Sequence, residues 1–123
     1  MLTSTRAAAA RATLCAALLL AAAQVQAHAK LIGAEPAANS SVAAPKIIQL
    51  KFDEDIAKKF SSVRLTHTGG SPVAITSMVT KDAKSLTALP TAALAPGLYT
   101  VSWTAVATDD GHKTMGSYSF AVK

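Results

Sequence analysis

Apolar and polar residues alternate along much of the chain after residue 45. The segment 46–52 (KIIQLKF) has Ile48, Leu50 and Phe52 at every second position. This period of two is typical of a strand that buries one face. The segments 98–105 (LYTVSWTA) and 115–123 (MGSYSFAVK) repeat the pattern. All three segments are therefore predicted to be strands.

Turn-forming residues divide the rest of the chain into shorter strands. The Gly69-Gly70 pair is expected to turn a hairpin within 62–78, and further strands are expected near Leu31 and over 85–90. The segment 53–60 (DEDIAKKF) has acids first and lysines last, which fits one helical turn. About seven strands with frequent turns predict an all-β fold, a single Greek-key, immunoglobulin-like β-sandwich or barrel.

The aromatic residues are expected to fill the core of this fold. Tyr99 and Trp103 could be regarded as a sugar-binding pair, but their strand spacing points both to one face. Burial is the better prediction for both side chains, Trp103 included. The same burial is predicted for Phe52, Phe60, Tyr118 and Phe120.

Residues 1–27 have the pattern of an export signal. Two arginines precede an apolar run of alanine and leucine, and small residues precede a cleavage position after Ala27. The apolar run is shorter than the roughly 20 residues that a transmembrane helix needs. Cleavage after Ala27 would make His28 the first residue, although cuts after Ala23 or Ala29 also fit the pattern.

The remaining residues, 28–123, suffice for one small domain with an apolar core. The only cysteine, Cys15, leaves with the signal, which excludes disulfides, thiolate catalysis and thiolate metal sites. The formal net charge of +5 falls by two with the loss of Arg6 and Arg11. The basic residues do not gather in a patch with stacking aromatics, so nucleic-acid binding is not expected.

The segment 107–116 (ATDDGHKTMG) is the strongest candidate for chemistry. Asp-Gly is a favoured turn pair, so a hairpin turn would by itself explain it. Asp110 and His112, however, are two residues apart, and at a strand end both would point the same way. They can then form a carboxylate–imidazole pair. Asp109 is expected to serve the turn, unless the two aspartates exchange roles.

A histidine at the new N-terminus would offer two metal ligands, its free amine and its imidazole. With the His112 nitrogen and the Asp110 oxygen, His28 completes a set of three nitrogens and one oxygen. A tetragonal set of nitrogen and oxygen ligands suits Cu(II), which also heads the divalent affinity series. One Cu(II) ion per chain is therefore predicted.

The mature chain resembles the CopC family of exported copper-resistance proteins over nearly its whole length. The resemblance rests on His28 after the cut, on LKFDE ending at Glu54, on PGLYTVSW, and on DGH followed by GSYSF. It implies Cu(II) ligation by His28, Asp110 and His112, with Glu54 as a weak or supporting candidate. It also implies a non-catalytic copper carrier or buffer in the periplasm, with a membrane importer or another exported copper protein as partner.

Some members of that family have a methionine cluster for Cu(I), but only Met78 and Met115 follow the signal here. Two isolated methionines are expected to pack in the protein, so no separate Cu(I) site is predicted. His67 is expected to be a solvated surface residue. Two other functions stay open: a copper monooxygenase-like enzyme that uses His28, and a metal-free immunoglobulin-like interaction module.

Overall fold

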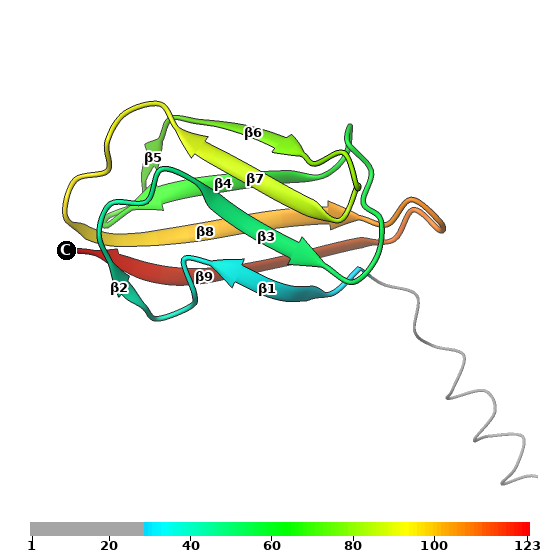
Figure 1. Ribbon diagram of the computed structural model, residues 1–123, viewed down its shortest axis with the longest axis horizontal. Coiled ribbons are helices and arrows are strands. Elements are labelled where there is room, and N and C mark those ends of the chain that lie inside the picture. Colours follow the sequence, from blue (N-terminus) through cyan, green and yellow to red (C-terminus); the bar gives the residue numbers. More distant parts are fainter. Residues whose placement is uncertain (1–28) are drawn as a thin grey trace, which may run out of the picture.

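The computed structural model describes residues 29–123, and the predicted signal and His28 lie outside this part. Residues 29–123 contain nine strands and no helix. The strands form two stacked sheets, with the orders β1-β3-β7-β6 and β2-β9-β8-β4-β5 (Figure 1). The strands are β1 (Leu31–Glu35), β2 (Ser41–Val42), β3 (Ile48–Phe52), β4 (Ser62–His67), β5 (Ser71–Val73), β6 (Ile75–Val79), β7 (Ser85–Pro90), β8 (Gly97–Val106) and β9 (Lys113–Val122). The all-β sandwich is confirmed. The number of strands exceeds the predicted seven because it includes β2 and β5, which are only two and three residues long.

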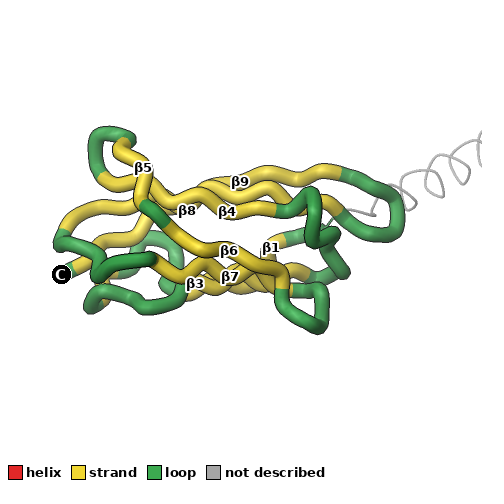
Figure 2. The backbone as a smooth tube through the Cα atoms, turned by 90° about the horizontal axis from the view of Figure 1, so that it is seen from above, coloured by secondary structure: helices red, strands yellow, loops and turns green. Residues whose placement is uncertain are grey.

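The two sheets form separate layers when the sandwich is seen from above (Figure 2). The chain passes from one layer to the other between β1 and β2, β2 and β3, β3 and β4, β5 and β6, and β7 and β8, as in Greek-key sandwiches. The predicted Gly69-Gly70 hairpin is the β4–β5 pair. The segment 53–60 contains no helix. Ile56 forms a β-bridge with Ala107, and a single turn follows, in which the Ser61 N–H donates to the Ala57 carbonyl at 3.0 Å. No helix able to cross a bilayer occurs in residues 29–123.

The inward faces of the strands form the core, as the period-two pattern predicts. Phe52, Tyr99 and Phe120 are at most 2% exposed. Tyr99 stacks on Phe120 with 5.7 Å between ring centroids. Its hydroxyl donates a hydrogen bond of 2.7 Å to the Ala95 carbonyl, which ties the start of β8 to the loop before it.

Three aromatic residues depart from the predicted burial: Phe60, Trp103 and Tyr118, the last two of which are partly buried and pack against the core. Phe60 is 67% exposed, because it lies in the turn that precedes β4 and not on a strand between the sheets. Trp103 is only half-buried, although its ring meets Phe52 edge-on at 5.2 Å between centroids. The indole lies over Gly116, its pairing partner on β9, where an added Cβ would come within 2.5 Å of the ring.

The two methionines also depart from the prediction that they pack in the protein. Met78 on β6 is 55% exposed and Met115 on β9 is 71% exposed. Met115 alternates with more buried residues on β9, and Met78 lies in the exposed middle of the edge strand β6, so neither side chain packs in the core. Because β6 and β9 belong to different sheets, the two thioethers belong to different layers of the sandwich.

Tyr118 is a half-buried residue on the inward face of β9. Its hydroxyl is buried and has no hydrogen-bond partner within residues 29–123. Burial raises the pKa of Tyr118 to about 12, because desolvation disfavours the phenolate. The two tyrosines of the structure therefore have opposite hydrogen-bonding states.

Replacing each tyrosine by phenylalanine should change stability in opposite directions. Tyr118→Phe removes an unpaired buried hydroxyl and is expected to raise the free energy of unfolding by about 1 kcal/mol. Tyr99→Phe deletes the bond to Ala95 and is expected to lower it by about 1 kcal/mol. Urea unfolding of both variants measures the difference, and equal losses would show that the Tyr118 hydroxyl is bonded.

Candidate metal site

The connection between β8 and β9 lies at one end of the sandwich, at the right of Figure 1. The Ala107 N–H donates to the His112 carbonyl at 2.9 Å, and the Gly111 N–H donates to the Ala107 carbonyl at 3.0 Å. Gly111 has a φ of 71°, a conformation that glycine adopts without the strain of a side chain. The Asp-Gly pair thus closes the hairpin, as turn chemistry predicts.

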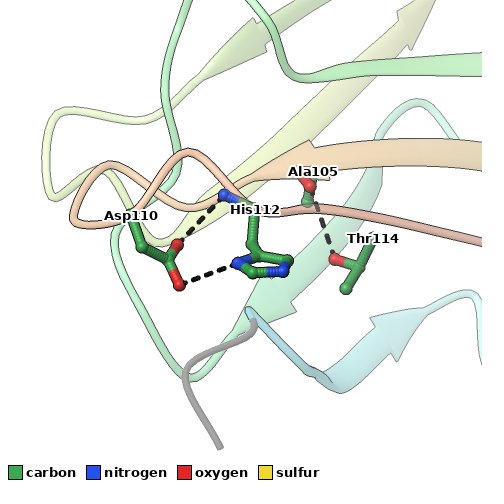
Figure 3. Close-up of polar contacts among 4 residues, drawn as sticks. All are labelled: Ala105, Asp110, His112 and Thr114. Atoms are coloured by element: carbon green, nitrogen blue, oxygen red, sulfur yellow. Dashed lines mark hydrogen bonds and ion pairs between the residues drawn. The ribbon is translucent and has the colours of Figure 1, made fainter.

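The same turn brings Asp110 and His112 together (Figure 3). The His112 backbone N–H donates to one carboxylate oxygen of Asp110 at 3.0 Å. The other carboxylate oxygen lies 3.1 Å from the ring nitrogen Nδ1 of His112. Asp110, and not Asp109, is therefore the partner of the imidazole, and the two residues form the pair that their spacing suggested.

Hydrogen bonding from His112 controls the charge and orientation of this pair. The backbone N–H of His112, and then its ring, lower the pKa of Asp110 below its ordinary value, so the carboxylate stays ionised in weak acid. When Nδ1 carries the proton of this bond, Nε2 keeps the lone pair that a metal ion requires. A carboxylate that orients a metal-binding imidazole in this way is a common arrangement in metal sites.

Ala29, the first described residue, is hydrogen-bonded to β9, the strand that begins directly after His112. The Thr114 hydroxyl donates to the Ala29 carbonyl at 2.9 Å, and the Ala29 side chain is buried in the core. His112, the residue before β9, and Thr114 on β9 lie on the side where β1 begins (Figure 3). The next residue is held by the segment after β3, since the Lys30 N–H donates to the Asp53 carboxylate at 2.7 Å. Ala29 is thus held by a residue two positions from His112, and Lys30 by the residue that follows β3.

Glu54, the weak candidate, lies half-buried on the segment after β3. This segment runs beside the end of β8, since Ile56 bridges Ala107 and the Thr108 N–H donates to the Asp55 carbonyl at 3.0 Å. Among residues 29–123, no three His, Cys, Asp or Glu side chains form a group that could hold a metal ion. Glu54 therefore does not complete a three-residue cluster with Asp110 and His112.

His67 lies at the other end of the sheet and is not the solvated residue that was predicted. It is half-buried and stacks on Tyr99 with 4.5 Å between ring centroids. It also packs against Gly97, where an added Cβ would lie 2.5 Å from its Nε2. Tyr99 is eight positions from Ala107 along the chain, which corresponds to about 27 Å of strand. His67 is thus too distant to share a metal ion with His112.

Comparison with known proteins identifies the family to which this chain belongs. A family model described as the CopC domain matches residues 31–123. The chain belongs to the CopC family. It is 41% identical to Copper resistance protein C of Escherichia coli over 105 residues, which are 79% of this chain and 82% of that protein. Its identity to Copper resistance protein C of Pseudomonas syringae pv. tomato is 39% over 118 residues, 90% of this chain and 93% of that protein.

Solved CopC-family structures have the same architecture. The crystal structure of PcoC, a methionine rich copper resistance protein from Escherichia coli, matches with a TM-score of 0.73 at 42% identity, covering 79% of this chain and all (100%) of PcoC. CopC from Methylosinus trichosporium OB3b matches with a TM-score of 0.71 at 33% identity, covering 78% of this chain and 94% of that chain. The two-sheet sandwich is therefore the fold of the family.

Proposed function

We propose that this protein is an exported Cu(II)-binding protein that carries or buffers copper in the periplasm as part of copper resistance. Membership of the CopC family and the copper resistance proteins among its relatives support this function. The observation that carries it is the Asp110–His112 pair, which lies two residues before Thr114, the anchor of Ala29.

The proposed ligand set joins this pair to His28. Consecutive Cα atoms are about 3.8 Å apart, so the residue before Ala29 starts close to β9, the strand that begins after His112. After cleavage behind Ala27, His28 would supply its amine and imidazole, His112 its Nε2, and Asp110 a carboxylate oxygen. Nδ1 and Nε2 point in different directions on the imidazole ring. For Asp110 to ligate the same ion, one carboxylate oxygen must therefore exchange its bond to Nδ1 for the metal, while the other can keep the His112 backbone N–H. Three nitrogens and one oxygen suit Cu(II), with Glu54 as a weaker or supporting candidate.

We propose that the protein is a carrier without a catalytic role and that it has no separate Cu(I) site. The relatives are copper resistance proteins by name, which favours a carrier over an oxygen-activating enzyme or a metal-free interaction module. Met78 and Met115 lie on different sheets, so their sulfur atoms are not placed to share one ion. Delivery would be to a membrane importer or to another exported copper protein.

The first test is the position of the N-terminus. Mass spectrometry of the exported protein is expected to give a chain that begins at His28 with an unmodified amine, because the small residues Val25 and Ala27 stand at the positions before the cut that favour cleavage. A chain that begins at Gln24 or Lys30 would remove the chelate and contradict the proposed ligand set.

Copper binding by the processed protein should depend on one histidine of the fold and not on the other. One Cu(II) per chain is expected. His112→Ala should weaken binding by more than the roughly 10–100-fold typical of losing a residue that only supports a ligand, because it deletes a nitrogen ligand. His67→Ala, the matched control at the far end of the sheet, should leave the affinity unchanged. Competition titration measures both, and the reverse result would contradict the assignment.

The affinity should also fall as the pH falls. Imidazole and α-amine groups have reference pKa values of about 6.5 and 7.7–8, and both must be deprotonated to bind metal. Asp110, whose pKa is lowered by His112, stays charged over this range. Titrations from about pH 8 to pH 5 should therefore show a continuous loss of affinity. Constant affinity with loss only near the carboxylate range of about pH 4 would assign binding to carboxylates instead.

A further inference from the structure

We infer that Asp53 and Thr114 are positioning residues that hold the start of the processed chain against His112 and thereby set its copper affinity. This inference rests on the proposed function, because it takes the His28 chelate as the ligand that is positioned. The two residues act through the backbone of Ala29 and Lys30 and are not themselves ligands.

Thr114 provides the contact from the five-stranded sheet. It stands two residues after His112 on β9, and its hydroxyl donates to the Ala29 carbonyl at 2.9 Å. The same hydroxyl lies 3.4 Å from the Ala105 carbonyl of the neighbouring strand (Figure 3). Because Thr114 is half-buried, its hydroxyl is partly shielded from competing water. The bond therefore places Ala29 at the start of β9, two residues along the chain from His112.

Asp53 provides the contact from the four-stranded sheet. It follows the last residue of β3, and its carboxylate accepts the Lys30 N–H at 2.7 Å. Its own N–H donates to the Lys30 carbonyl at 3.0 Å. Both backbone groups of Lys30 are thus held by one residue. The Ala29 methyl, buried in the core at 1% exposure, fixes the neighbouring position.

These contacts come from both sheets and converge on two consecutive residues. Fixing a chain residue in one conformation costs conformational entropy. Because the fold already orders Ala29 and Lys30, copper binding would only need to order the residue before them. Preorganisation of this kind raises affinity without adding a ligand. The clamp formed by Asp53 and Thr114 is therefore expected to act on affinity and on the geometry of the ligand set.

The test compares variants that break each bond with variants that keep it. Thr114→Val removes the hydroxyl and Thr114→Ser retains it; Asp53→Ala removes the acceptor and Asp53→Asn retains it. Asp55→Ala is the control for charge, since it removes a carboxylate from the same segment while its carbonyl still accepts from Thr108. The measurements are Cu(II) competition titration and electron paramagnetic resonance of the exported, processed protein, and hydrogen exchange of the Lys30 amide without metal.

Thr114→Val and Asp53→Ala should each weaken Cu(II) binding about three- to tenfold, the range that the net contribution of one hydrogen bond predicts. Asp53→Ala should also speed exchange of the Lys30 amide, and both variants should alter the resonance spectrum. Thr114→Ser, Asp53→Asn and Asp55→Ala should stay within about twofold of the unsubstituted protein, well inside the tenfold step of 1.4 kcal/mol.

The outcomes separate this inference from the proposed function. If the unsubstituted protein takes up no Cu(II), both are wrong. If it binds one Cu(II) and the two bond-breaking variants bind equally well, the clamp is wrong and the copper function stands. Weakening by Asp55→Ala equal to that by Asp53→Ala would assign the effect to the charge of the segment and overturn the role of Asp53. If Thr114→Ser and Asp53→Asn bind Cu(II) as weakly as Thr114→Val and Asp53→Ala, the hydrogen bonds of these two residues do not set the affinity.

Discussion

The antiparallel pairing of β8 with β9 is the constraint on which the rest of the structure depends. The two ten-residue strands stay in register from Gly97 opposite Val122 to Val106 opposite Lys113. This register points Phe120 into the core and Thr114, on the same face, toward Ala29. A slip of one residue would turn each of these side chains to the opposite face. The burial of the core and the geometry of the end that holds Ala29 therefore follow from one register.

Features that depend on neighbours in the sequence could be predicted from it. Strands with a period of two were found because alternation is local, and the Asp110–His112 pair was found because its members are two residues apart. Phe60 and Trp103 were misplaced for a different reason. Their hydrophobicity predicts burial, but Phe60 lies in a turn outside the strands, and the exposure of Trp103 depends on its packing against residues distant in the sequence, such as Phe52.

The contacts that hold Ala29 and Lys30 could not be predicted from spacing. The Lys30–Asp53 bond spans 23 residues and the Thr114–Ala29 bond spans 85, so neither has a local pattern. The only available signal was that Thr114 stands two residues after His112 and so shares its face of the strand. His67 is a similar case, because its stacking on Tyr99 depends on the register between β4 and β8.

The location of the pair at an open end of the sandwich suits a protein whose metal is cargo. The His112 side chain is 58% exposed and that of Asp110 is 31% exposed, so a ligand from an acceptor could approach the ion without opening the core. Under the proposed function, folding and metal loading are also separate events. Ala29 and Lys30 are held by groups of the folded domain, whereas the amine of His28 exists only after cleavage, since before it that nitrogen belongs to a peptide bond. A domain that folds through residues 29 and 30 can therefore acquire its full ligand set only when the signal has been removed, which restricts tight copper binding to the exported form.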